Sequence, residues 1–444
     1  MAANNKNDKM LTGSITSSII LFSLPIMLGN LFQKLYNTVD AVVVGQLLTD
    51  EDLAAISIGT PLMDVMYALI IGACIGISVI ISQAYGAKDW SKLKHTLSTA
   101  LIGGCAATLV LCILCSVFIR PILELQGADA AAADKAASYL AVIIYGLIIT
   151  FLYNLFSSAL RAVGDSRTPC ISLILAFFLN TALNLLFVIV FKSGLAGTAY
   201  ATVISQAFSA WICIRAIYKR QPFMALRRGD FKFSRAVGFS ILKFSWAGAL
   251  QQTVVNVGRM ITQSFLYALP IHIVSGYNMA IRIEALHFCL IQGVSAALVT
   301  FLAQNVGAKH FDRIRRGVFS AELISLVMCT FSALMFTLFA PQIISIFSPS
   351  QDIIDAGATY LRTMAFSYLL AASCELTQSF YRGIGRIHLT VIVSISKIVT
   401  RVVFSYLLVP IFGITGICYS IMIGWILMFL FSGGYTLHTL RKQF

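Results

Sequence analysis

The sequence predicts an all-α polytopic membrane protein with twelve transmembrane helices, arranged as two pseudo-symmetric six-helix lobes. Three observations lead to this prediction. Of the 444 residues, 58% are hydrophobic and only 11% are charged, whereas charged residues make up about 25% of soluble proteins. Apolar runs of roughly 20 residues or more, long enough to cross a bilayer, recur along the whole chain. The second half of the chain also repeats blocks of the first.

The apolar runs, divided at polar residues, glycines and prolines, give twelve expected helices. They cover residues 15–45, 53–84, 96–119, 138–160, 169–191, 195–217, 236–268, 272–303, 317–339, 358–380, 388–411 and 414–438. Several runs are longer than a bilayer requires, so we expect some helices to be tilted or to extend beyond the membrane. The first run is too long for a cleavable signal peptide.

Lysine and arginine are distributed unevenly between the loops. Most of them occur at the two termini and in the segments 86–95, 161–168, 215–243, 307–317 and 382–387. The alternate loops contain only Arg120, Lys135, Lys192 and Arg362. The positive-inside rule therefore predicts that both termini lie in the cytoplasm. The net charge of +14 then reflects membrane topology and gives no reason to expect nucleic-acid binding.

Matching blocks occur in the same order in both halves of the chain. Residues 81–100 align without gaps with residues 302–321, an offset of 221, and share the sequence Gly-Ala-Lys. At the same offset Arg161-Ala-Val-Gly matches Arg382-Gly-Ile-Gly, and near the end of each half residues 194–200 match 413–419 at an offset of 219. Asn37 and Asn256 are also 219 residues apart.

Each half contains six expected spans, so the halves are predicted to be parallel repeats related by an axis along the membrane normal. This places an N-lobe at residues 1–217, a basic cytoplasmic linker at 218–235 and a C-lobe at 236–444. Two equivalent lobes suit a transporter that works by alternating access.

The first span contains a polar face. Gln33, Asn37 and Asp40 recur at i, i+4 and i+7, which places them on one side of a helix. A carboxylate deep in a transmembrane helix costs about 2.5–3.5 kcal/mol on insertion scales and usually faces a bundle interior or a watery cavity. We therefore expect Asp40 to be functional. The alternative is that Asp40 lies at the headgroup level and neutralises Lys34.

Several blocks resemble the multidrug and toxic compound extrusion (MATE) transporters of prokaryotes. They are LYNTVDAVVVG at 35–45, QAYGAKD at 83–89, RAVGDSRTP at 161–169 and QNVGAK at 304–309. The resemblance implies a secondary antiporter that expels organic cations, often amphipathic drugs, in exchange for H⁺ or Na⁺. Asp40 matches the aspartate of the first helix that this family uses for protonation or cation binding.

The other coupling residues of the family match only in part. The fifth span has Asn180 and Asn184 where one branch has an asparagine followed by an aspartate, so a second acid is absent there. Glu375 resembles the acid that another branch carries in its tenth helix. The resemblance therefore leaves the coupling ion open between H⁺ and Na⁺, with Asp40 and Asn180 as the place where Na⁺ would bind.

The expected ion-coupling and substrate-binding residues form one set. It comprises Gln33, Tyr36, Asn37, Asp40, Asn180, Asn184, Thr202, Gln252, Asn256, Glu284 and Glu375. Gln252 and Asn256 are the repeat counterparts of Gln33 and Asn37. Glu284 shares a helix face with His287, and a salt bridge involving the nearby Arg282 would explain it without a functional role. We expect no catalytic residue, no resident metal and no cofactor, so the chain is not predicted to be an enzyme.

Two other functions remain open. A lipid-linked oligosaccharide flippase would share the two-lobe design but would require a more basic cavity than Lys34, Arg259, Arg282, Lys397 and Arg401 indicate. A cation channel would also place carboxylates at membrane depth. The absence of a G-x-x-x-x-G-K-[ST] motif argues against an ATP-driven pump. We expect a monomer in the bacterial inner membrane, with organic cations and the lipid bilayer as its partners.

Overall fold

The structure is a computed structural model that describes residues 9–125 and 130–443. Residues 1–8 and Phe444, which the topology prediction assigns to the cytoplasmic termini, lie outside the described residues. The first half contains the helices α1 Lys9–Thr12, α2 Ile15–Leu47, α3 Asp50–Gly86, α4 Trp90–Leu125, α5 Ala130–Ala162, α6 Arg167–Leu185, the π-helix η1 Leu186–Val190 and α7 Gly194–Arg220.

The second half follows the same order. After the short 3₁₀ helix η2 Arg228–Asp230 come α8 Arg235–Leu266, α9 Ile271–Gly307, α10 Phe311–Ser345, α11 Gln351–Met364, α12 Ser367–Gly383, α13 Ile387–Phe412 and α14 Ile414–Lys442. Every regular element in the described part of the chain is a helix, which confirms the predicted fold class.

Ten helical segments within residues 9–125 and 130–443 are long and apolar enough to cross a membrane. They lie in α2, α3, α4, α5, α6 with η1, α7, α9, α10, α13 and α14. The other two predicted spans, 236–268 and 358–380, correspond to α8 and to parts of α11 and α12. The chain is therefore a polytopic membrane protein, as its composition predicts.

The prediction of one continuous helix over 358–380 is wrong. α11 ends at Met364 and α12 begins at Ser367. At this break the hydroxyl of Ser367 donates to the backbone carbonyl of Met364 at 2.6 Å. A serine side chain that bonds to a nearby carbonyl competes with the backbone hydrogen bonds of a helix. No glycine or proline marks the break, so the sequence pattern does not reveal it.

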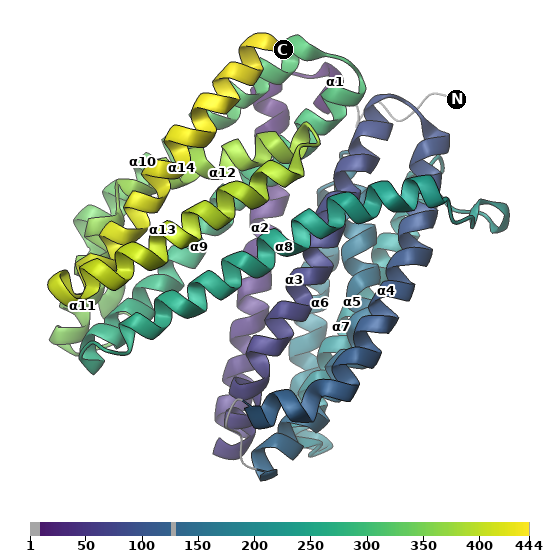
Figure 1. Ribbon diagram of the computed structural model, residues 1–444. Helices are drawn as coiled ribbons and strands as arrows, with labels where there is room; N and C mark the ends of the chain where they lie inside the picture. The colour runs from purple at the N-terminus through teal and green to yellow at the C-terminus, as the bar shows by residue number, and fades with distance from the viewer. Residues whose placement is uncertain (1–8, 126–129, 444) are drawn as a thin grey trace. The chain divides into compact units, whose positions relative to one another are not determined.

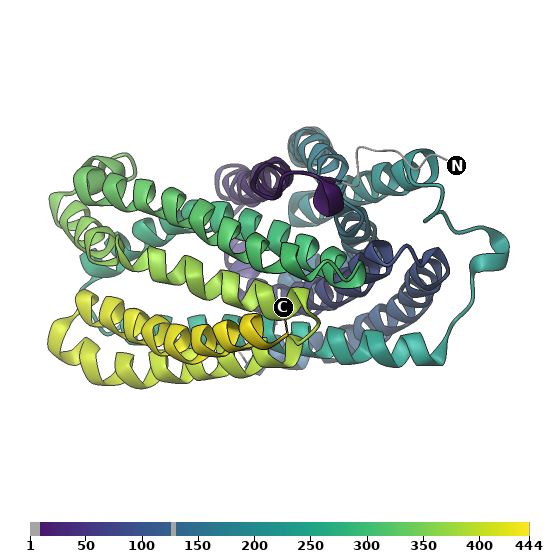
Figure 2. The same ribbon diagram turned by 90° about the horizontal axis from the view of Figure 1, so that it is seen from above.

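The helices form two compact units. Unit 2 comprises Leu28–Ala249, and unit 1 comprises the residues up to Met27 together with those from Leu250 onward. Within unit 2, α3 to α7 lie side by side, and within unit 1, α9 to α14 do so (Figures 1 and 2). These units differ from the predicted lobes because their boundaries fall inside α2 and α8 instead of at the linker.

The division of α2 follows from its hydrophobic partners. Ile19, Phe22 and Met27, in the first part of α2, belong to a buried cluster with Val294 and Leu298 of α9. The residues of α2 from Leu28 on belong to unit 2. The predicted N-lobe assigned the whole first helix to one body, because the repeat pattern in the sequence carries no information about which helices pack together.

A close helix crossing occurs once in each unit. In unit 2, a Cβ atom added at Gly72 of α3 would lie 2.4 Å from the backbone nitrogen of Ala249, next to Gly248. In unit 1, a Cβ atom added at Gly293 of α9 would lie 2.3 Å from Cγ of Met27. Gly72 and Gly293 are separated by the 221-residue offset of the repeat, as are Met27 and Gly248. The same crossing is therefore built twice.

We expect Gly72→Ala to lower the thermal unfolding temperature of the detergent-solubilised protein. The added methyl group would overlap the backbone of α8, and overpacking of this kind costs about 1–3 kcal/mol. Gly45→Ala is the matched control, because a Cβ atom at Gly45 meets nothing within 4 Å and alanine favours a helix over glycine. Equal unfolding temperatures for the two variants would contradict the close crossing.

Candidate functional site

Asp40 of α2 lies beside two asparagines of α6, within unit 2. Asn184 Nδ2 donates to Asp40 Oδ1 at 2.6 Å and to Asn180 Oδ1 at 3.1 Å. Both asparagines are fully buried. They are four residues apart on one helix face, which brings both amides to the side of α6 that meets Asp40. We refer to these three residues as the Asp40 triad.

Two hydrogen-bonding atoms of the triad are unsatisfied. Among the described residues, Asn180 Nδ2 and Asn184 Oδ1 have no hydrogen-bond partner although both atoms are buried. A buried polar atom without a partner costs roughly 1–3 kcal/mol, and such atoms occur where a site takes up a ligand or changes state. The triad therefore contains one donor and one acceptor that a proton, a cation or a substrate could engage.

Tyrosines from three helices surround Asp40. Tyr36, one turn earlier on α2, lies beside Thr202 of α7 and within electrostatic range of Asp40. Tyr67 of α3 and Tyr139 of α5 also interact electrostatically with Asp40. The structure thus places the predicted residues Tyr36 and Thr202 next to the triad. Tyr67 was missed, because a lone tyrosine in an apolar span looks like a packing residue.

Gln33 and Asn37 lie further along the same face of α2. Gln33 Nε2 donates to Asn37 Oδ1 at 3.4 Å, and both side chains are exposed. Within the described part of the chain, neither residue is hydrogen-bonded to a member of the triad. The polar face predicted from the sequence is thus divided, with Asp40 bonded to α6 and the other two residues bonded to each other.

The end of α6 departs from regular helical geometry immediately after Asn184. The segment η1, Leu186–Val190, is a π-helix, and Phe191 N–H donates to the carbonyl of Leu186 at 3.0 Å. π-Helical turns are rare and are frequently found at functional sites. The irregularity therefore supports a functional role for this part of α6.

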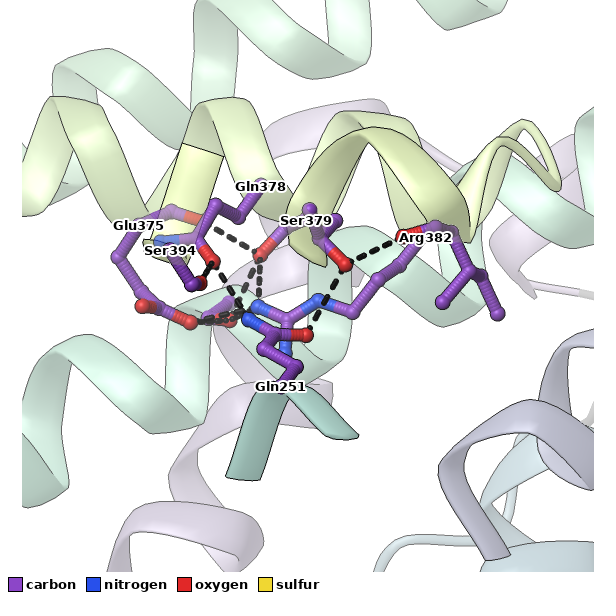
Figure 3. A network of polar contacts seen from close by, with 9 residues as sticks. Gln251, Glu375, Gln378, Ser379, Arg382 and Ser394 are labelled. Carbon is purple, nitrogen blue, oxygen red and sulfur yellow. Dashed lines mark hydrogen bonds and ion pairs between the residues drawn. The ribbon is translucent and has the colours of Figure 1, made fainter. Parts of the chain in front are cut away.

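Glu375, the predicted acid of unit 1, forms an ion pair with Arg382 of the same helix. Arg382 Nη2 lies 2.6 Å from Glu375 Oε1, and the two side chains are only 12% and 27% exposed. Ser295 of α9 also donates to Glu375 Oε1 at 3.2 Å, and its hydroxyl lies 2.7 Å from that of Ser379. Figure 3 shows the side chains of Glu375, Ser379 and Arg382 pointing toward one another. The charge of Glu375 is therefore balanced inside unit 1.

A second set of contacts occupies the next turn of α12. Gln251 Nε2 of α8 donates to Gln378 Oε1 at 2.5 Å, and Ser394 Oγ of α13 donates to the same oxygen at 3.3 Å (Figure 3). Thr390 donates to Gln251 Oε1 at 3.0 Å. These amides and hydroxyls connect three helices of unit 1.

The hydrogen-bond network of unit 1 contains Gln251, whereas the sequence predicted a site role for the adjacent residue, Gln252. The repeat pointed to Gln252 and Asn256, which the structure places half-buried on α8. Gln251 was missed because its counterpart at the same offset is the apolar Phe32. The pairing of Arg382 with Glu375 could have been predicted from the sequence, because residues seven apart share a helix face.

Glu284 and His287 of α9 lie among buried aromatic rings. Tyr360 of α11 donates to Glu284 Oε2 at 3.4 Å. The His287 ring lies 4.7 Å from the ring of Tyr368, centre to centre, and its Nε2 is 3.9 Å from Cys329 Sγ. In this packed region His287 is buried and Glu284 is half-buried, and the two side chains have different partners.

The carboxylate of Glu322 in α10 accepts a hydrogen bond from Ser373 of α12. The part of the chain that the structure describes contains no group of three or more histidine, cysteine or acidic residues placed to hold a metal ion. Among the intramembrane bases, the side chain of Arg259 lies outside the described residues.

The Asp40 triad occurs in only one half of the repeat. At the offset shared by Asn37 and Asn256, Asp40 corresponds to Arg259. At the offset of the Arg161 and Arg382 blocks, Asn180 and Asn184 correspond to Arg401 and Ser405. The second half thus has basic residues or a serine at positions where the first has a carboxylate and two amides.

Comparisons with known proteins agree with the fold and the repeat. The MatE family model matches residues 25–186 and 248–407, one match in each half. The probable multidrug resistance proteins YpnP and YoeA of Bacillus subtilis (strain 168) are 30% and 26% identical to the chain. The YpnP alignment covers 80% of each chain, and the YoeA alignment covers 87% of this chain and 85% of YoeA.

A solved structure described as the crystal structure of MATE in the straight conformation superposes with a TM-score of 0.91 at 26% identity, and the match covers 99% of each chain. The resemblance inferred from the blocks of the sequence is confirmed, and it identifies a membrane transporter and not an enzyme. Because the family model matches most of the chain, once in each half, the chain belongs to the MatE family of multidrug and toxic compound extrusion transporters.

Proposed function

We propose that this protein is a secondary antiporter that exports small organic cations in exchange for H⁺ or Na⁺. Family membership supports the transporter class, and the relatives named as multidrug resistance proteins support drug-like substrates. The observation that carries the proposal is the Asp40 triad. It is a carboxylate hydrogen-bonded to the buried amide of Asn184, which also bonds to the buried amide of Asn180, within helices that are otherwise apolar.

The triad supports exchange by competition at a single carboxylate. Asp40 binds either the coupling ion or the positive charge of the substrate, because one carboxylate in an apolar setting cannot balance two cations. The tyrosines around Asp40 provide aromatic faces that attract organic cations. Uptake of the coupling ion then weakens the binding of the substrate, which is the requirement for antiport.

The orientation of Asn184 bears on the identity of the coupling ion. Its Nδ2 points to Asp40, which stabilises an ionised carboxylate. A proton on Asp40 would need an acceptor, and Na⁺ would need oxygen ligands. If the Asn184 amide rotated, its unpaired Oδ1 would face Asp40. That oxygen could accept a hydrogen bond from a protonated Asp40 or act as a ligand of Na⁺. The proposal therefore covers both ions, and a flux measurement must decide between them.

The remaining parts of the proposal concern placement and partners. We propose a monomer in the bacterial inner membrane, and the distribution of lysine and arginine between its loops supports a cytoplasmic position for both termini. The flippase alternative rests on the basic residues of the second half, such as Arg401. In unit 1, however, Arg382 is paired with Glu375. This ion pair reduces the positive charge that a pyrophosphate headgroup would require, so it weakens the flippase alternative.

A liposome experiment tests this function. Purified protein is reconstituted, and the accumulation of a fluorescent organic cation is followed under an imposed H⁺ gradient and, separately, under a Na⁺ gradient. We expect one of the two gradients to drive accumulation of the cation above its equilibrium concentration. A protein that only dissipates ion gradients would be a channel, and one that moves lipid-linked sugars but no organic cation would be a flippase.

A further inference from the structure

The connector between α7 and α8, residues 221–234, has an ordered structure within unit 2. Met224, Ala225 and Leu226 are buried, and Tyr218 of α7 donates to the carbonyl of Leu226 at 2.7 Å. The ring of Phe223 packs against that of Trp90 at an interplanar angle of 47°, with ring centres 4.7 Å apart. The first part of the connector is therefore folded against the ends of α4 and α7 as a packed turn.

The second part of the connector is held along α4. Lys232 N–H donates to Ser98 Oγ at 3.0 Å, and Ser234 N–H donates to Thr99 Oγ1 at 3.2 Å. Phe233 lies against Gly103, where an added Cβ atom would meet its ring at 3.2 Å. These contacts fix the direction in which the chain enters α8.

Asp230 does not neutralise the exposed basic side chains around it. Its Oδ2 accepts from the backbone N–H of Arg227 and from Lys94 Nζ, both at 2.9 Å. These two donors, the backbone N–H first, hold the pKa of the Asp230 carboxyl below its usual value. It is the only acid between Arg215 and Lys243. Its carboxylate is engaged by Lys94 of α4 and by the connector backbone, and the described residues form no ion pair with Arg228, Arg235 or Lys243.

The start of α8 has one face against the protein and one face exposed. Gly76 of α3 approaches the backbone of Phe244, and Gly72 approaches that of Gly248, on the inner face. Phe239, Leu242 and Trp246 are 72%, 64% and 66% exposed. These three residues follow Arg235 at i+4, i+7 and i+11, so they continue one stripe along the helix.

The length of this stripe matches half of a bilayer. Arg235 and Trp246 are eleven residues apart, which corresponds to roughly 16 Å along a helix, and the hydrocarbon core of a bilayer is roughly 30 Å thick. Arg235 begins the stripe at its basic end, close in sequence to Arg228 of η2. Lys243 can extend its long side chain back toward the same end.

We propose that the connector and the exposed stripe of α8 form a binding site for an anionic phospholipid of the adjacent leaflet. The lipid phosphate binds Arg228, Arg235 and Lys243, and an acyl chain lies along Phe239, Leu242 and Trp246. Clusters of lysine and arginine next to a transmembrane helix attract anionic headgroups. Arg228 belongs to the fixed connector, Arg235 begins α8, and Lys243 follows eight residues later with a long side chain that can reach back toward Arg235. The site lies outside the Asp40 triad, so it stands or falls independently of the proposed transport function.

Tryptophan quenching tests the site on the full chain. The protein is reconstituted in vesicles with brominated phosphatidylglycerol or brominated phosphatidylcholine, and the fluorescence due to Trp246 is obtained by subtracting the signal of Trp246→Phe. We expect stronger quenching by phosphatidylglycerol. In R228Q/R235Q/K243Q the preference should fall on the order of 100-fold, since each basic residue near an anionic surface contributes about fivefold.

The matched control is K309Q/R315Q/R316Q. It removes three exposed basic residues from the α9–α10 junction of unit 1 and should retain the preference for phosphatidylglycerol at Trp246. Equal quenching by the two lipids in the unaltered protein would overturn the proposal, as would an equal loss in the control variant. Binding of soluble polyglutamate to the detergent-solubilised protein, without any lipid preference, would assign the surface to an acidic protein and also overturn it.

Discussion

Asp40→Asn is expected to abolish ion-driven accumulation of organic cations while the protein still folds and inserts. The asparagine retains an oxygen that can accept the hydrogen bond from Asn184 Nδ2, but it has no charge to exchange between ion and substrate. A hydrogen bond to a charged group is stronger than a neutral one by about 1–2 kcal/mol. Removal of a charge from an apolar site offsets this loss. Accumulation in liposomes should therefore fall to the level of empty vesicles, at nearly unchanged protein yield.

The control for this experiment is Asp134→Asn, in the same unit. Asp134 pairs with Arg120 at 2.8 Å, but both side chains are more than 60% exposed, and exposed pairs contribute at most about 1 kcal/mol. Its transport should stay close to that of the unaltered protein. Export at a normal rate by a well-folded Asp40→Asn variant would refute the central role of Asp40. The coupling carboxylate would then have to be Glu375 or Glu284.

Arg382→Gln is expected to destabilise unit 1 strongly, and Glu375→Gln added to it should restore much of the loss. Breaking a buried ion pair from one side leaves an uncompensated charge, at a cost of up to about 3–5 kcal/mol. Removing both charges avoids this cost, because glutamine can still exchange hydrogen bonds with Ser295 and Ser379. Thermal unfolding of the single and double variants measures the coupling between the two residues.

Transport by the double variant decides what the pair does. If Glu375 is held by Arg382 only to stabilise unit 1, the double variant should transport at a rate close to normal. A double variant that folds but does not transport would instead make Glu375 a coupling residue. Arg161→Gln is the matched control in unit 2, where the counterpart of Glu375 is Asn154 and where Arg161 bonds to Ser158 at 3.1 Å. Its effect on stability should be smaller.

The sequence was sufficient to predict the fold class, the family and the centre of the candidate site. Apolar length and composition predict spans directly, because the bilayer requires them. Asp40, Asn180 and Asn184 were recognisable because polar groups are costly in apolar helices and occur there for a reason. The helical spacing of Asn180 and Asn184 also predicted that they would share a face.

Other features depend on tertiary contacts that leave no pattern in the sequence. The packing of α10 on α12 determines that Glu322 faces α12 and that Ser373 is its hydrogen-bond partner. Gln251 enters the network of unit 1 although its neighbour Gln252 had the better match in the repeat. In each case the spacing along one helix was not enough, because the partner lies on another helix.

The division of α2 between the two units has a consequence for biosynthesis. Residues 15–27 are synthesised well before their partners in the cluster around Val294 and Leu298, which follow about 270 residues later. At synthesis rates of about 5–20 residues per second, this delay is roughly 13–50 s. During that time lipid, or a membrane chaperone, must cover Ile19 and Phe22. Unit 1 can therefore reach its final packing only by joining residues 15–27 to a segment made about 270 residues later, and the same delay makes this step sensitive to truncation of the nascent protein.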